Sequence, residues 1–366
     1  MTVSNQAERL ARTGRLEGLD LARFFAFVGM VIVNFTIVMG AERMGAEGMG
    51  AEGGGGPLAW FTLALEGRAA ATFVVLAGLG LGLAAGRGVE STVPVTIRRA
   101  VFLLVLGLAN TLVFDADILH YYAFYFLFGA LLLSWPTPTL IAVIVALNIA
   151  FVGMNFIFDY DTGRNWVDYS YADFWTLTGF VRNLFFNGWH PVVPWLGFLL
   201  FGVILSRLRL GERRLRNALM LGGVAAYLLA EVLGAQLRPL LASLDPELAY
   251  LATTGPVPPM PLYMLAGMGM ASFVVGVCLW LAELAAMAPF MRVVVPAGRQ
   301  TLTLYIAHIM VGMGVIEALG MLGGQTLGVS FMASLIFCFV AVLFAWLWSR
   351  AFRRGPVEML MRELAG

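Results

Sequence analysis

Asp117 and His120, at the start of an apolar stretch, have the types and spacing that general base catalysis requires. Residues three apart on a helix share a face, so the carboxylate can reach the imidazole. A carboxylate there fixes the tautomer of the ring and raises its basicity. The alternative is structural: Asp115 or Asp117 caps the helix N-terminus, and His120 fills an interfacial gap. We predict that His120 and Asp117 are catalytic residues and keep the structural role open.

A second candidate, His308, belongs to a polar stripe within another apolar stretch. Thr301, Tyr305 and His308 are spaced i, i+4 and i+7, so a helix places them on one face. A titratable group near the middle of a membrane is costly, so His308 should face a cavity or another helix. A hydrogen bond that packs two helices is the alternative. We predict a catalytic role for His308 and substrate contacts for Tyr305 and Thr301.

Five further polar or aromatic residues at the ends of apolar segments or inside them are predicted to bind substrate: Arg68, Glu66, Asn34, His190 and Trp195. Arg68 could bind an anionic group, but a long cationic side chain at this position also suits an interfacial anchor. His190 precedes a proline at a helix start and could likewise be an anchor. Asn34 needs a partner within lipid, which helix packing alone could supply.

The elements that position these residues must lie in a membrane. The 366 residues are 60% hydrophobic and 12% charged, with a mean hydropathy of +0.85, whereas a soluble domain carries roughly 25% charged residues. A net charge of +1 without a basic face argues against nucleic acid as a partner. Cys278 and Cys338 lie within apolar segments, so we expect neither a disulfide nor a metal site.

Apolar runs long enough to cross a bilayer predict an all-α polytopic bundle of about ten transmembrane helices. Their expected bounds are 18–40, 69–86, 97–114, 116–134, 138–158, 191–207, 215–239, 261–284, 300–320 and 328–350. Open strands are excluded because lipid cannot satisfy their backbone groups.

The distribution of arginine predicts the orientation in the plasma (inner) membrane. One side receives most of the arginines, while the other receives only Arg43, Arg164, Arg182 and Arg238. The positive-inside rule then places both termini in the cytoplasm. We expect a cytoplasmic segment over 1–17, one transmembrane domain over 18–352 and a cytoplasmic tail over 353–366. Outside, we expect a Gly-rich loop at 41–56 and an interfacial amphipathic helix near 172–189.

Motifs in five segments, spread over most of the chain, occur in a recognisable order. They are Leu19-Asp20-Leu-Ala-Arg23 with Gly29-Met-Val-Ile-Val-Asn34, Gly67-Arg68-Ala-Ala-Ala-Thr72-Phe73, Asp117-Ile-Leu-His120-Tyr-Tyr122, His190-Pro-Val-Val-Pro194-Trp195, and Gly298-Arg299-Gln-Thr301-Leu-Thr303-Leu-Tyr305-Ile-Ala-His308. Together they resemble the bacterial membrane proteins related to the heparan-alpha-glucosaminide N-acetyltransferase catalytic domain, within the transmembrane acyltransferase superfamily.

The resemblance implies transfer of an acyl group from an acyl-CoA to an amino or hydroxyl group, commonly on a sugar, on the non-cytoplasmic side. Two positions depart from the family. Phe24 follows Arg23 where relatives usually have glycine, and the segment 41–68 contains no histidine, although the characterised acetyltransferases carry their active-site histidine between the first two spans. The base must therefore be His120 or His308.

Our first hypothesis is therefore a membrane-embedded acyltransferase acting on a glycan or lipid-linked acceptor of the cell envelope. Acetyl-CoA or another acyl-CoA would be a co-substrate, and no tightly bound cofactor is expected. Arg23 and Arg299 would bind the phosphates of the acyl-CoA, and Arg68 or Asn34 would stabilise developing charge. A role in fixing the topology is the alternative for both cytoplasmic arginines.

Two other functions stay open: a transporter or lipid flippase, and a non-catalytic scaffold. For each function the protein could also form a homo-oligomer. Whether the chain is an enzyme is not decided by these residues.

Overall fold

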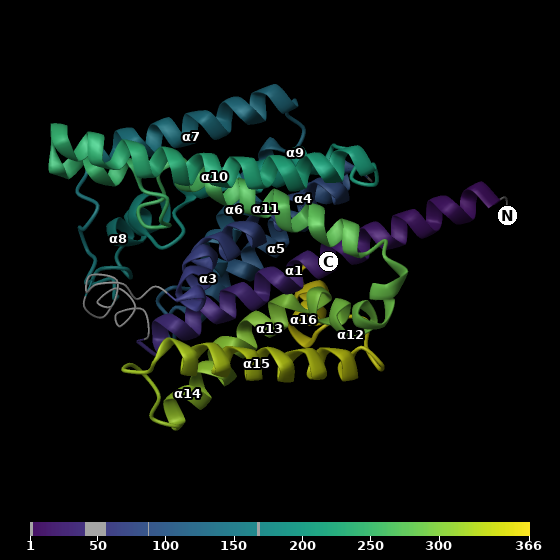
Figure 1. Cartoon of the computed structure of the whole chain (residues 1–366). Helices are drawn as coiled ribbons and strands as arrows, with labels where there is room; N and C mark the ends of the chain where they lie inside the picture. The colour runs from purple at the N-terminus through teal and green to yellow at the C-terminus, as the bar shows by residue number, and fades with distance from the viewer. Residues whose placement is uncertain (1–2, 41–55, 87, 167–168) are drawn as a thin grey trace. The chain divides into compact units, whose positions relative to one another are not determined.

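A computed structural model describes residues 3–40, 56–86, 88–166 and 169–366 (Figure 1). Nearly all of the predicted Gly-rich loop at 41–56 lies outside the described residues. The contacts divide the chain into two compact units: residues 1–73 with 274–360, and residues 74–273 with 361–366. Each unit contains one of the two predicted catalytic histidines.

The first unit is built around α1 (Val3–Val38), which packs against α12 (Ala288–Arg299) and α15 (Leu327–Trp348) (Figure 1). It also contains α3 (Pro57–Leu65), η3 (Ala285–Met287), α13 (Thr301–Ala307), the π-helical turn η4 (His308–Met313), α14 (Gly314–Ala318) and the start of α16 (Pro356–Ala365). At Gly298 a Cβ atom would lie 1.8 Å from the carbonyl oxygen of Asp20. Glycine therefore allows α12 to approach α1 where Asp20 and Arg299 meet.

The second unit packs α5 (Val89–Asn110) on α6 (Leu119–Leu132), and α7 (Thr137–Ile157) on α9 (Val192–Ser206). Most of α4 (Arg68–Ala85) and of α11 (Pro261–Leu281) belongs to it, as do α8 (Leu177–Arg182), the π-helical turn η1 (Asn183–Asn187), α10 (Arg213–Leu244) and η2 (Pro246–Ala252). A Cβ atom at Gly107 would lie 2.3 Å from the backbone nitrogen of His120. This glycine lets α5 contact the first turn of α6.

The predicted all-α bundle is confirmed. Among the described residues, eight helices are long and apolar enough to cross a membrane, and a ninth span arises if α8 and η1 are joined to α9 across a bend of 52°. The remaining predicted span, 116–134, is the 14-residue helix α6, which is about 21 Å long at 1.5 Å per residue. It begins late because residues 111–118 form turns, and the Asp117 carboxylate accepts hydrogen bonds from the first N–H groups of the helix.

Two other boundaries differ from the predictions. The second span begins at Pro57 instead of 69, because α3 continues into α4 through Glu66 and Gly67, whose φ is 67°. The first span begins at Glu17, close to the predicted 18, although the helix α1 itself already begins at Val3. In the segment 172–189 helix begins only at Leu177.

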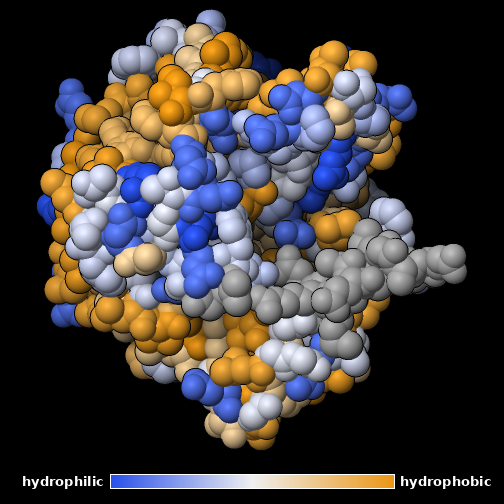
Figure 2. Space-filling view, turned by 90° about the vertical axis from the view of Figure 1, so that its left-hand side faces the viewer, coloured by the Kyte–Doolittle hydropathy of each residue, from blue (hydrophilic) through white to orange (hydrophobic). Residues whose placement is uncertain are grey.

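Large apolar side chains are exposed on the surface of both units, as the lipid environment of a multi-pass membrane protein requires. Examples are Phe339 in the first unit and Val105, Ile149 and Leu221 in the second. Figure 2 shows broad areas of hydrophobic residues on the face that it presents.

Candidate functional site

The strongest candidate site begins at the N-terminus of α6, where Asp117 and His120 are both buried. Oδ2 of Asp117 lies 3.2 Å from Nδ1 of His120 and accepts the backbone N–H of Leu119 at 2.7 Å. Its Oδ1 accepts a hydrogen bond of 2.7 Å from Nδ2 of Asn110 on α5. Asp117 therefore serves as a helix cap and as the partner of His120 at once, so capping and the predicted contact do not exclude each other.

This geometry sets the tautomer of His120. A carboxylate that accepts hydrogen bonds from several donors offers only acceptors to the ring, so Nδ1 carries the proton and Nε2 holds a free lone pair. Nε2 is buried and has no hydrogen-bond partner in the described part of the chain. Nε2 can therefore act as a proton acceptor, because the carboxylate holds the proton on the other ring nitrogen, Nδ1.

Two other predicted residues, His190 and Trp195, lie in the same unit. The ring of Tyr121 lies 3.9 Å from the ring of His120 and 5.8 Å from that of His190, and His190 lies 4.6 Å from Trp195, measured between centroids. Nδ1 of His190 and Nε1 of Trp195 are also buried without a partner among the described residues. Three buried, unpaired nitrogens therefore belong to one cluster, as expected at a polar binding site.

Asparagines at the π-helical turn η1 support this cluster, and sequence reasoning missed them. Tyr121 donates a hydrogen bond of 2.5 Å to Oδ1 of Asn183, and Tyr171 donates one of 2.7 Å to Oδ1 of Asn187. Nδ2 of Asn187 donates to the carbonyl groups of Tyr160 and Thr162, each at 2.8 Å. The sequence carried a signal, because asparagine is unusual inside an otherwise apolar helical stretch.

In the first unit, the imidazole of His308 pairs with the side-chain amide of Asn34. Nδ1 of His308 contacts the carbonyl oxygen of Tyr305, so it must donate, and Nε2 accepts from Nδ2 of Asn34 at 3.0 Å. The Tyr305 ring lies 5.0 Å from that of His308. Both ring nitrogens of His308 therefore have partners, which matches the packing alternative. In the described part of the chain, no hydrogen bond joins Thr301 to these residues.

Arg68 faces the end of α3. Its Nη1 atom donates to the carbonyl oxygens of Leu63 and Glu66, each at 3.3 Å, and its side chain is buried. A cation at a helix C-terminus satisfies carbonyl groups that the helix leaves open. These contacts give Arg68 a capping role in addition to its predicted role in substrate binding, while Glu66 is half-buried at the same turn.

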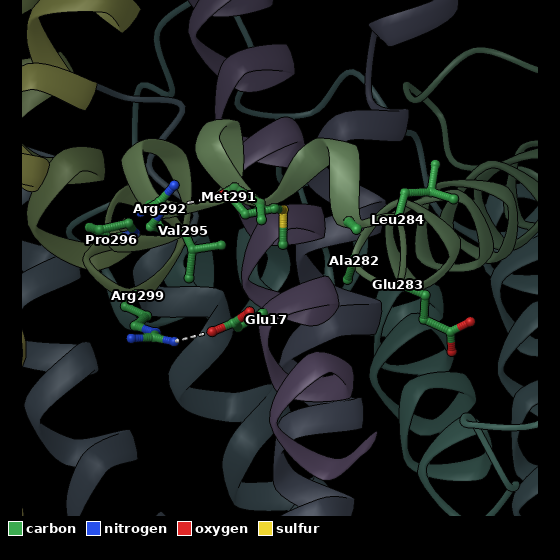
Figure 3. Close-up of a pocket in the computed structure, with 11 residues that line it drawn as sticks. Glu17, Ala282, Glu283, Leu284, Met291, Arg292, Val295, Pro296 and Arg299 are labelled. Atoms are coloured by element: carbon green, nitrogen blue, oxygen red, sulfur yellow. Dashed lines mark hydrogen bonds and ion pairs between the residues drawn. The ribbon is translucent and has the colours of Figure 1, made fainter. Parts of the chain in front are cut away.

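Asp20 and Arg23, which are three residues apart on α1, form an ion pair, and Arg299 joins it. Asp20 accepts hydrogen bonds of 2.6 Å from Nη1 of Arg23 and 2.9 Å from Nε of Arg299, and Nη2 of Arg299 lies 3.9 Å from Glu17. Beside this cluster is a cavity of about 370 Å³, shown in Figure 3. Its charged lining consists of Glu17, Glu283, Arg292 and Arg299.

A family model described as heparan-alpha-glucosaminide N-acetyltransferase, catalytic, matches residues 15–236, which is more than half of the chain. The chain belongs to this family. A second family model, described as a protein of unknown function (DUF418), matches residues 203–366. No curated protein and no solved structure matches the chain.

The heparan-alpha-glucosaminide N-acetyltransferase family match makes this an acyltransferase-like membrane protein. The matched residues include Asp117, His120, His190 and Trp195, whereas His308 and Arg299 lie only in the segment matched by the second model. The match and the ring nitrogen without a partner in the described chain both distinguish His120 from His308.

Proposed function

We propose that the chain transfers an acyl group from an acyl-CoA to a hydroxyl or amine of an envelope glycan or lipid, with His120 as the general base. The observation that supports this most is the buried Nε2 atom of His120, which has no partner in the described chain while Asp117 binds Nδ1. The site would act on the external side of the plasma membrane.

The reaction follows from this arrangement. Nε2 of His120 takes the proton of the acceptor, whose oxygen or nitrogen attacks the acyl carbonyl carbon. The carbon–sulfur bond then breaks, and the leaving CoA sulfur takes a proton back from the imidazolium. The Asp117 carboxylate stabilises the positive ring, as the carboxylate of a catalytic triad does. The unpaired N–H of Trp195 can bind an acceptor oxygen.

For the donor, we propose that the cavity beside Arg299 binds the phosphates of acyl-CoA. Arg292 and Arg299 both line it, and a phosphate accepts paired hydrogen bonds from a guanidinium. Arg23 and Arg299 both donate hydrogen bonds to the carboxylate of Asp20, so a bound phosphate could compete with Asp20 for one of the two arginines. The positive-inside rule would put this cavity on the cytoplasmic side.

The test is acyl transfer by the purified protein, with labelled acetyl-CoA and extracted envelope glycans and lipids as acceptors. Removing a general base typically costs 10²- to 10⁴-fold in rate, so His120→Ala should lower kcat by that range. His308→Asn should leave kcat within about threefold, because His308 serves packing. No transfer by the wild type, or equal transfer by His120→Ala, would overturn the proposal.

A transporter or lipid flippase is the second candidate, favoured by the bend of 52° between the helix Leu177–Asn187 and α9. Broken helices with polar groups at the break are typical of transport sites. Substrate-dependent uptake into proteoliposomes without acyl transfer would support this function.

A further inference from the structure

Arg164, on the loop between α7 and α8, has an unusual set of neighbours. The loop pairs Arg164 with Tyr171 in an antiparallel bridge. The guanidinium carbon then lies 4.7 Å from the ring centroid of Trp189, 4.8 Å from that of Trp166 and 5.5 Å from that of Tyr160. Cation–π contacts of this kind hold a guanidinium in a fixed orientation. Arg164 is therefore presented by an aromatic clamp and does not extend freely into solvent.

The hydrogen-bonding capacity of this guanidinium is only partly used. Nε donates to the carbonyl oxygen of Asn187 at 2.6 Å, but Nη2 is buried and has no partner in the described part of the chain. Arg164 forms no ion pair there either. The neighbouring carboxylates have other donors, since Asp159 accepts from Thr162 and Asp161 from the indole of Trp166. A half-buried cation without a counter-ion is unfavourable unless a ligand supplies the negative charge.

A second unsatisfied donor adjoins Arg164. The hydroxyl of Tyr160 is buried and has no hydrogen-bond partner among the described residues. Burial raises the pKa of Tyr160, and the positive charge of Arg164 opposes this only in part. The hydroxyl therefore keeps its proton and can donate it in a hydrogen bond. A phenol O–H beside a guanidinium whose Nη2 atom has no acceptor in the described chain matches an anion with several oxygens.

We propose that Arg164 and Tyr160 bind the oxyanion of a phosphate ester. Exposed apolar side chains follow in the same loop and at the start of α8, with Trp175 at 65% and Leu177 at 81% exposure. Tryptophan and leucine with this exposure suit the boundary between lipid and water, where phospholipid headgroups lie. We expect the headgroup of a phospholipid as the ligand. A phosphate on a lipid-linked acceptor would present the same group. Only this second ligand depends on the proposed acyl transfer; binding of a phospholipid headgroup does not.

The test is native mass spectrometry of the full-length protein, purified in a maltoside detergent and titrated with phosphatidylglycerol. Arg164→Gln should weaken phosphatidylglycerol binding about tenfold, since a charge-assisted hydrogen bond is lost. Arg164→Lys should also weaken it, because lysine cannot stack or donate in paired fashion, and Tyr160→Phe should weaken it less than Arg164→Gln. The matched control is Arg238→Gln, which removes an exposed arginine of α10 and should leave binding unchanged.

Two further ligands identify the source of the phosphate. Diacylglycerol, which lacks phosphate, should bind all variants equally. Glycerol 3-phosphate, measured by the thermal stability of the same samples, should bind weakly if the ligand is a membrane lipid. Binding of glycerol 3-phosphate comparable to that of the lipid, and dependent on Arg164, would support a soluble or acceptor-borne phosphate.

The result that overturns the proposal is unchanged phosphatidylglycerol and glycerol 3-phosphate binding in both Arg164→Gln and Tyr160→Phe. If Arg164→Gln does not fold, Tyr160→Phe and Arg164→Lys decide the question. No turnover is measured, so failure of the acyl-transfer assay would leave this result unaffected.

Discussion

At the residue scale, ring nitrogens distinguish the two candidate bases. Nε2 of His120 has no partner among the residues that the structure describes, while Nε2 of His308 accepts from Asn34. Asp117 makes the difference, because its carboxylate binds Nδ1 of His120 and leaves the other nitrogen with a lone pair. Asp117 is thus a positioning residue, and its effect should appear in kcat more than in substrate binding.

Asp117→Asn tests this role. An asparagine oxygen can still accept the N–H of Leu119, so α6 keeps its cap. The amide is neutral, however, and no longer stabilises a positively charged His120, so kcat should fall by about 10²-fold or more with KM nearly unchanged. Initial rates over a range of acetyl-CoA concentrations give both constants. The matched control is Asp115→Asn, at an exposed position two residues earlier, which should keep the wild-type kcat.

The same two histidines show what sequence can predict about a site. Asp117 and His120, like Asp20 and Arg23, are three residues apart, and this spacing predicts both contacts, although Asp117 itself precedes α6. The partner of His308 is 274 residues away in the chain, so only tertiary packing reveals it. The clamp around Arg164 was missed because its aromatic rings come from a loop and lack helical periodicity.

At the scale of elements, the contact between α5 and α6 positions His120. A Cβ atom at Gly107 would lie 2.3 Å from the backbone nitrogen of His120, a distance that the helices cannot accept without moving apart. Gly107→Ala should therefore destabilise the protein by about 1–3 kcal/mol, although alanine is the better helix former. It should also reduce acyl transfer. Thermal unfolding followed by tryptophan fluorescence measures the first effect.

Gly153→Ala is the control for this substitution. Gly153 lies within α7, and nothing approaches the position of its Cβ within 4 Å. Alanine should be neutral there or stabilise the protein slightly, by about 1 kcal/mol at most. Equal melting temperatures for both variants would mean that the close contact between α5 and α6 does not constrain His120.

Apolar periodicity predicted the helices well, but it could not place the breaks within them. The π-helical turns at Asn183–Asn187 and His308–Met313 lie inside stretches whose composition is helical throughout. The late start of α6 depends on hydrogen bonds from backbone N–H groups to Asp117, and hydropathy does not register these.

At the scale of the whole chain, the number of crossings depends on α6, whose 14 residues are few for a membrane span. Arg207, at the C-terminal end of α9, donates hydrogen bonds to the carbonyl groups of Leu133 and Trp135 and to the hydroxyl of Thr137. The turn between α6 and α7 therefore lies at the same end of the second unit as the end of α9. An α6 that reaches this end completes the even number of crossings that the arginine distribution predicts.

Single cysteines test this topology in a background without Cys278 and Cys338, both of which are buried. A membrane-impermeant maleimide applied to intact cells should label Thr162→Cys, on the predicted external loop, but neither Ser134→Cys, on the α6–α7 turn, nor Arg353→Cys; all three positions are exposed. Permeabilised cells should label every variant. Labelling of Ser134→Cys and Arg353→Cys without Thr162→Cys in intact cells would overturn the predicted topology, since either an α6 that does not cross or a reversed orientation gives this pattern. Asp115→Cys, at an exposed position before α6, separates the two: it is labelled if α6 does not cross and protected if the orientation is reversed.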